Sequence, residues 1–175
     1  MNQFYTFYES PVGQLLLVGD ECYLKVLSYS QKNKEINAIS QEVPILTQTK
    51  KWLDTYFNRR CPKIFSGPLL IQGTPFQKDV WQILRQIPYG QLVTYGAIAQ
   101  QICLKTGQSK MSAQAVGRAV GCNPIAIIIP CHRVIGSTGH LTGYVGGLEI
   151  KKKLLQIEQA NITSFFHKKD NSLYS

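Results

Sequence analysis

The 175-residue chain contains no run of 18 apolar residues, and its first residues lack a basic segment followed by an apolar one. The first absence excludes a transmembrane helix, and the second argues against a secretory signal peptide. We therefore expect a cytoplasmic protein that makes no membrane contact and keeps its thiols reduced. Hydrophobic residues make up 44% of the chain, which is ordinary for a globular protein with a packed core.

Paired cysteines are also missing. None of the five cysteines has CxxC spacing, and their number is odd, so a disulfide framework or a structural zinc site is not expected. The glycine-rich stretch 143–147 lacks a Walker pattern, so it does not indicate a phosphate loop. The sequence therefore predicts no metal and no cofactor. The cysteines are Cys22, Cys61, Cys103, Cys122 and Cys131.

Acidic residues are scarce in the second half of the chain. Residues 1–72 hold 8 Lys/Arg and 6 Asp/Glu, a net charge of +2, whereas residues 73–175 hold 11 and 4, a net charge of +7. This imbalance makes the second half the better partner for a polyanion such as DNA. Basicity alone is weak evidence, because many soluble proteins are basic.

The N-terminal half, residues 1–72 with a linker, has the pattern of an antiparallel meander followed by a helix. Three β-prone segments, 4–8, 14–18 and 22–29, are separated by turn signals. Apolar residues then recur at helical spacing from Ile45 to Phe57. Because no catalytic constellation is visible here, we expect this half to be structural.

The C-terminal half, residues 73–160, reads as mainly helical, and residues 161–175 read as a polar tail. Thr74-Pro75 predicts the beginning of a first helix, and Pro88-Tyr89-Gly90 predicts its end. Thr94 caps a second helix over 95–103, a connection spans 104–111, and Ser112 caps a third helix over 113–121. A last helix over 148–159 carries three consecutive lysines, 151–153, which we expect on a solvated or phosphate-facing edge.

The third helix, AQAVGRAVG, consists almost entirely of small residues. A helix this slim either packs closely against another backbone or enters a narrow groove. With the preceding helix it resembles a helix-turn-helix, but the long polar side chains that read the major groove are missing. The degenerate minor groove, about 6 Å wide, is the better match. The residues alone leave both alternatives open.

The stretch Ile129-Pro130-Cys131-His132-Arg133-Val134 is the centre of the sequence. The run 125–129 predicts a buried strand, which Pro130 ends, so that Cys131 stands at its mouth. A cysteine after an apolar run is often inert, but a neighbouring histidine or positive charge favours the nucleophilic thiolate. On extended backbone the Cys131 and His132 side chains diverge, so a water molecule would have to connect them.

His132 then needs a partner that sets its tautomer and balances its charge. The residues leave two candidates, Glu149 and Glu158, because the other acids of this half are remote. Asn123, which precedes Pro124, is either a turn residue or a side chain whose amide faces the site.

The motif PCHRV, with Asn123-Pro124 upstream and GYVGGL at 143–148 downstream, closely resembles the O6-alkylguanine-DNA alkyltransferases. The resemblance is specific from about residue 74 to residue 158 and weaker before that. It implies an α+β protein: a small N-terminal domain with an antiparallel, ribonuclease-H-like sheet, and a mainly helical C-terminal domain with a winged helix-turn-helix-like DNA-binding element.

The resemblance also implies roles for individual residues. Cys131 takes the alkyl group, and His132 and Glu158 deprotonate the Cys131 thiol through water. Asn123 is a hinge, and Tyr95 acts on the phosphate of the flipped nucleotide and on the leaving group. The remaining residues form the DNA- and substrate-binding set. They are Ser112, Ala113, Gln114, Ala115, Gly117 and Arg118 in the small helix, and Arg133, Val134, Tyr144, Val145 and Gly146 around the base pocket.

The predicted function is direct-reversal DNA repair. An alkyl group passes irreversibly, in one turnover, from O6 of guanine or O4 of thymine in double-stranded DNA to Cys131, after the nucleotide flips through the minor groove. We expect a monomer that could bind DNA cooperatively. The alternatives are a cysteine-dependent hydrolase, a non-catalytic reader of alkylated bases, and a helix-turn-helix regulator.

Two positions depart from the family pattern. Gln114 stands where many members carry an intercalating Arg, so Arg118 could take that role. Val145 replaces a Ser found in some members, which removes a hydroxyl that could bond the leaving base.

Overall fold

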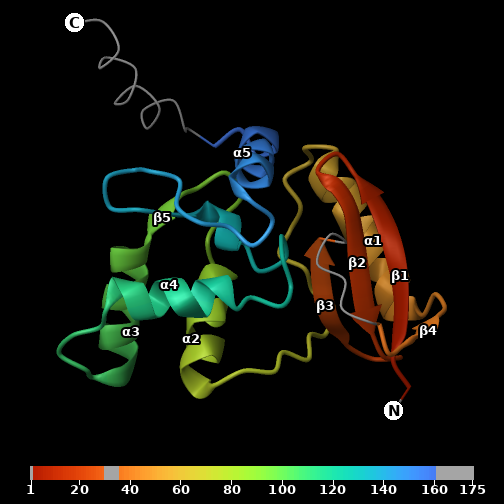
Figure 1. The fold of residues 1–175 in the computed structure, drawn as a ribbon, viewed down its shortest axis with the longest axis horizontal. Helices are drawn as coiled ribbons and strands as arrows, with labels where there is room; N and C mark the ends of the chain where they lie inside the picture. Colours follow the sequence, from red (N-terminus) through yellow and green to blue (C-terminus); the bar gives the residue numbers. More distant parts are fainter. Residues whose placement is uncertain (1, 30–35, 161–175) are drawn as a thin grey trace, which may run out of the picture.

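A computed structural model describes residues 2–29 and 36–160, which form two lobes joined by a short connection (Figure 1). The predicted tail, residues 161–175, lies outside the described residues. No helix in the described part of the chain has the length and apolar character needed to span a membrane.

The N-terminal lobe is a four-stranded sheet covered by one helix. β1 (Phe4–Ser10), β2 (Gly13–Gly19) and β3 (Leu24–Tyr29) form the expected antiparallel meander. A short β4 (Ile39–Ser40) adds a parallel edge strand beside β1, giving the order β3-β2-β1-β4. Helix α1 (Pro44–Phe57) packs against the sheet through its apolar face, as its period predicted.

The C-terminal lobe is built from helices and one two-stranded parallel sheet. It contains α2 (Pro75–Leu84), β5 (Val93–Thr94), α3 (Tyr95–Thr106), α4 (Ala113–Gly121), a 3₁₀ turn η2 (Cys131–Arg133), β6 (Val134–Ile135) and α5 (Leu148–Ile157). β5 and β6 bring the start of α3 beside the segment that follows Cys131. The mixed α+β architecture with a helical second domain agrees with the prediction.

The helix starts of this lobe follow the capping signals in the sequence. Thr74 makes a complete capping box with Gln77, and Thr94 and Ser112 cap α3 and α4 through their hydroxyl groups. The ends were predicted less well. α2 stops at Leu84, before the Pro-Tyr-Gly signal, and α3 continues to Thr106, where Gly107 ends it in the left-handed conformation.

The two lobes share one apolar core, and β3 is the strand that joins them. Leu27 N donates to Pro124 O at 3.0 Å, and Ala126 N donates to Leu27 O at 2.8 Å. The Leu27 side chain is fully buried. The N-terminal sheet is therefore attached by backbone hydrogen bonds to the segment that leads to Cys131.

Leu27→Ala should lower the free energy of unfolding by about 2–5 kcal/mol, because it opens a cavity in the shared core. Leu104→Ala is the matched control, since Leu104 is 86% exposed, and it should change stability by less than about 0.5 kcal/mol. Urea denaturation measures both. Equal effects would show that the core is not continuous at this point.

Candidate active site

The segment before Cys131 is not the strand that its isoleucines predicted. Ile125 makes a single parallel bridge with Leu27, and the chain then turns: Ile128 N donates to Ala126 O, and Ile129 N donates to Ile125 O. Ile127 takes a φ of +68°, which a β-branched residue rarely adopts. The strand prediction was therefore wrong. Every side chain of the run is buried, and a buried turn needs apolar residues as much as a buried strand does.

Asn123 closes this turn and reaches the thiol of Cys131. Its amide nitrogen donates to Ile129 O at 2.7 Å and to Cys131 Sγ at 3.2 Å, while its Oδ1 accepts from Ile125 N at 3.0 Å. The acceptor contact to a backbone N–H fixes the orientation of the amide. Asn123 is therefore both the turn residue and the site residue that the sequence left as alternatives.

Cys131 begins the η2 turn and is only 4% exposed. Burial raises the pKa of its thiol above the ordinary value, although the Asn123 hydrogen bond and the positive charge of Lys151 act in the opposite direction. The thiol is consequently protonated at neutral pH, and a base has to remove its proton before the sulfur can act as a nucleophile.

The carboxylate of Glu158, at the end of α5, is the acceptor around which the site is assembled. Oε1 accepts from His132 Nε2 at 2.6 Å, from Tyr56 OH at 2.7 Å and from an Arg133 terminal nitrogen at 2.9 Å. Oε2 accepts from Arg133 Nε at 2.8 Å and from Gly90 N at 3.0 Å. Burial raises the pKa of Glu158, but the contacts with His132 and Arg133 outweigh it and hold the pKa well below the ordinary value.

The structure thus favours Glu158 over Glu149, which is exposed and pairs with Lys152. It places Arg133 differently from the prediction. Arg133, expected among the DNA- and substrate-binding residues, is buried against Glu158 and also donates to Ile87 O at 2.6 Å. Its charge balances the carboxylate, so Glu158 does not force a proton onto His132.

His132 is fully buried, and its hydrogen bond decides its tautomer. Because the ionised Glu158 can only accept, Nε2 of His132 carries the proton. Burial lowers the pKa of His132, with Arg133 and Lys151 adding to the effect, and this outweighs the raising influence of Glu158. Nδ1 is buried and has no hydrogen-bond partner among the described residues. The imidazole therefore keeps a free basic nitrogen at neutral pH.

Tyr56 is a site residue that the sequence analysis missed. It comes from α1 of the N-terminal lobe, and besides Glu158 its hydroxyl lies 3.4 Å from His132 Nε2. Burial and the nearby Glu158 raise its pKa well above the ordinary value, so the hydroxyl remains a donor. The helical pattern predicted a buried Tyr56, and a buried hydroxyl needs a partner, but the sequence could not name that partner.

Lys151 contradicts the expectation of a lysine-rich solvated edge. Its side chain is fully buried, and Nζ donates to Val134 O at 2.6 Å and to Thr142 O at 3.1 Å. Burial lowers its pKa to about 8. Lys151 therefore connects α5 to β6 and to the loop that follows, whereas only Lys153 of the three is fully exposed.

The residues expected to hold the base lie in β6 and in the loop over 144–146. Val134 is buried and pairs with Val93 across the small parallel sheet. The Tyr144 ring lies 6.4 Å from the His132 ring, centre to centre, in an edge-to-face arrangement. Val145 and Gly146 are both half-buried in this loop. These residues and Cys131 thus share one region of the C-terminal lobe.

Helix α4 combines the two alternatives considered for its small residues. Val116, Ala119 and Val120 are buried, and Ala119 O accepts from Trp81 Nε1 at 2.9 Å. On the other face, Ser112, Ala113, Gln114 and Arg118 are exposed, and Ala115 and Gly117 are half-buried. One face therefore packs closely, and the other is available to a partner.

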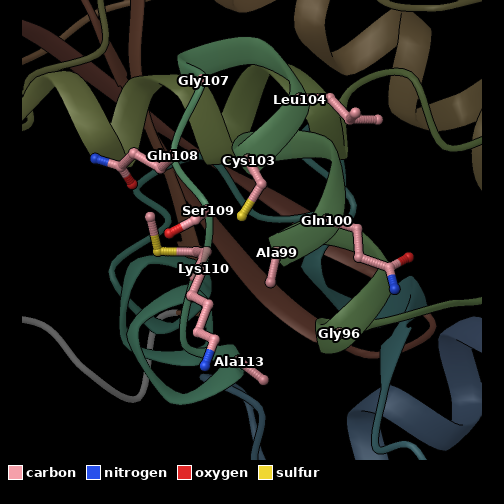
Figure 2. A pocket seen from close by; sticks show the side chains of 11 residues that line it. Gly96, Ala99, Gln100, Cys103, Leu104, Gly107, Gln108, Ser109, Lys110 and Ala113 are labelled. Carbon is pink, nitrogen blue, oxygen red and sulfur yellow. The ribbon is translucent and has the colours of Figure 1, made fainter.

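A hollow of about 580 Å³ lies along this outer face, lined by Tyr95, Gln114, Gly117, Arg118 and Thr142 among others. The Tyr95 hydroxyl accepts from Thr142 Oγ1 at 3.1 Å. A larger hollow of about 870 Å³ adjoins it between α3 and the 107–111 connection (Figure 2). Cys103 lines the larger hollow, whereas Cys131 does not, so its size does not mark the reacting centre.

No group of three or more His, Cys, Asp or Glu side chains within 2–29 and 36–160 is arranged to hold a metal ion. The clustered titratable groups of the site are instead paired with one another.

Two family models match the chain. The ribonuclease-like domain of 6-O-methylguanine DNA methyltransferase matches residues 3–71, and the DNA binding domain of the same family matches residues 75–160. Similar proteins include the methylated-DNA–protein-cysteine methyltransferases of Methanosarcina acetivorans, 45% identical over 89% of this chain and 97% of that protein, and of Haemophilus influenzae, 40% identical over 89% and 86%.

Solved structures agree. The crystal structure of Mycobacterium tuberculosis OGT in complex with DNA superposes with a TM-score of 0.79 at 38% identity, covering 93% of this chain and 99% of that one. The O6-methylguanine-DNA methyltransferase of Pyrococcus kodakaraensis shares the fold, with a TM-score of 0.51 at 20% identity. The resemblance inferred from PCHRV is therefore confirmed, and the chain belongs to the 6-O-methylguanine DNA methyltransferase family, the methylated-DNA–protein-cysteine methyltransferases.

Proposed function

We propose that the protein repairs O6-alkylguanine, and O4-alkylthymine, in double-stranded DNA by transferring the alkyl group once and irreversibly to Cys131. The observation that carries the proposal is the arrangement at Cys131. The buried thiol is held by Asn123, and next to it stands a neutral His132 whose tautomer is set by Glu158. A thiol that stays protonated until a base removes its proton suits a nucleophile that is used once.

The proton moves first. Nδ1 of His132 accepts the thiol proton through one water molecule, while Nε2 keeps its hydrogen bond to Glu158. The sulfur then forms a bond to the alkyl carbon as the carbon–O6 bond breaks, and the electron pair of that bond goes to the guanine. Tyr95 is suited to protonate the leaving base, because its hydroxyl accepts from Thr142 and keeps its own proton for donation.

The substrate has to come to the thiol. A nucleophile that is 4% exposed cannot reach an atom inside a base stack, so the alkylated nucleotide must flip out of the duplex. The exposed face of α4 suits the minor groove because its side chains are small. Gln114 and Arg118 lie one helical turn apart and line the same hollow beside Tyr95, so either could fill the gap left by the flipped base.

A thioether product is the reason for the single turnover that we propose. Sulfur bonded to an alkyl carbon by a thioether linkage is a stable group, so the alkylated Cys131 would not be regenerated. The protein would therefore be consumed stoichiometrically, in contrast to the hydrolase that the sequence left as an alternative.

Intact-mass measurement after incubation with an O6-methylguanine oligonucleotide tests the proposal. The protein should gain one methyl group and no more, and Cys131→Ser should gain none. Cys103→Ser is the matched control and should be labelled like the unaltered protein. Release of product without labelling would support the hydrolase, and tight binding without labelling would support the reader of alkylated bases.

Tyr56→Phe should slow methyl transfer about tenfold, because a hydrogen bond to a charged group contributes roughly 1.5–3 kcal/mol and His132 loses part of its support. Tyr8→Phe is the matched control. It removes a hydroxyl that donates to another carboxylate, Asp54, at 2.8 Å and away from the site. Single-turnover rates measure both variants, and equal rates would exclude a role for Tyr56 beyond folding.

Alanine variants of Gln114 and Arg118 should separate the two candidates for the intercalating residue. We expect the one that fills the gap to slow repair of duplex DNA by about tenfold or more when replaced, with little effect on the free base, since unstacking costs a few kcal/mol. If Gln114→Ala repairs duplex DNA normally while Arg118→Ala does not, Gln114 is not the intercalating residue. Normal repair by both variants would show that neither residue is required.

A further inference from the structure

The N-terminal strand β3 reaches the edge of the proposed pocket. Its Leu27 is hydrogen-bonded to the backbone at Pro124 and Ala126, so the strand cannot shift freely relative to the segment that holds Cys131. Tyr29 follows two residues later, on the same face of the strand as Leu27, and its side chain is only 5% exposed. The strand therefore presents a tyrosine from the N-terminal lobe to the C-terminal lobe.

Tyr29 contacts a residue of the pocket loop directly. Its hydroxyl lies 2.7 Å from the Tyr144 hydroxyl, and the two rings meet edge to face with their centres 5.9 Å apart. The Tyr144 ring is in turn packed beside the ring of His132. Burial raises the pKa of both Tyr29 and Tyr144, so both hydroxyl groups stay protonated and the hydrogen bond persists at neutral pH.

The same ring limits the loop at a second point. A Cβ placed on Gly146 would lie 2.7 Å from Cε2 and 2.9 Å from Cδ2 of Tyr29, which is closer than real Cβ atoms approach another atom. The backbone at Gly146 consequently passes so close to the Tyr29 ring that no side chain fits between them. The ring therefore sets how far the loop over 144–146 can move toward the N-terminal lobe.

We propose that Tyr29 is a specificity-determining residue that limits the size of the alkyl group Cys131 can accept. This rests on the proposed function. A substituent on O6 has to extend from a base held by the loop toward the sulfur, and Tyr144 borders that space. We expect a methyl group to need the least space, whereas a benzyl group requires Tyr144 and the loop to yield, which Tyr29 resists through its hydrogen bond and its ring.

The experiment compares single-turnover transfer from O6-benzylguanine and O6-methylguanine in the same duplex sequence. Tyr29→Ala should raise the benzyl-to-methyl rate ratio by about tenfold or more. Even one methylene group in an apolar pocket changes the discrimination between substrates by about this factor. Tyr29→Phe keeps the ring and loses only the hydroxyl, so its ratio should stay between those of the unaltered protein and Tyr29→Ala. Tyr23→Ala, an exposed tyrosine of the same lobe, should leave the ratio unchanged.

If Tyr29 had only a structural role, its replacement would slow transfer from both substrates equally and leave the benzyl-to-methyl ratio unchanged. That result would overturn the proposal. If Tyr29→Ala does not fold, the ratio is read on Tyr29→Leu, for which the same increase is expected and an unchanged ratio is equally decisive. The methyl rate of the unaltered protein separates the two proposals. Methyl transfer with an unchanged ratio rejects only the role of Tyr29, whereas the absence of any transfer to Cys131 rejects the proposed function.

Discussion

The buried carboxylate of Glu158 is the constraint on which the site depends. It accepts hydrogen bonds from Tyr56, Gly90, His132 and Arg133, which come from three separate parts of the chain. A carboxylate removed from water is stable only when its oxygens are satisfied in this way and its charge is balanced. The same contacts that stabilise the ion therefore fix the position and the tautomer of the His132 imidazole, the base in the proposed reaction.

This arrangement gives the N-terminal lobe a larger part than support. Tyr56 of α1 reaches Glu158, Leu27 of β3 is hydrogen-bonded to the segment before the nucleophile, and Tyr29 meets the pocket loop. Each contact crosses the boundary between the two matched family domains. The Cys131 thiol belongs to the C-terminal lobe, but its surroundings are completed by both lobes, so neither lobe alone would hold the same site.

The sequence was most informative where a local interaction decides the outcome. Thr74 and Ser112 begin helices because a hydroxyl satisfies free backbone N–H groups, and that pattern is visible within four residues. Prediction from the sequence failed where contacts between distant parts of the chain decide the position of a side chain. The sequence predicted a solvated Lys151, but its ammonium group is bound by two backbone carbonyl groups. It also predicted a DNA contact for Arg133, but the guanidinium is paired with Glu158. The turn at 125–129 is likewise held by β3, which lies about a hundred residues away in the chain.

The most direct test of this account is the protonation state of His132, read from the ¹⁵N chemical shifts of its imidazole in the resting protein. We predict a neutral ring with the proton on Nε2 and a free Nδ1, a state that persists when the pH falls to 6.5, the ordinary pKa of histidine. The burial that lowers the pKa, and the charge of Arg133 that balances Glu158, are the reasons. A doubly protonated ring at pH 7, or a proton on Nδ1, would contradict the role of His132 as the base that activates Cys131.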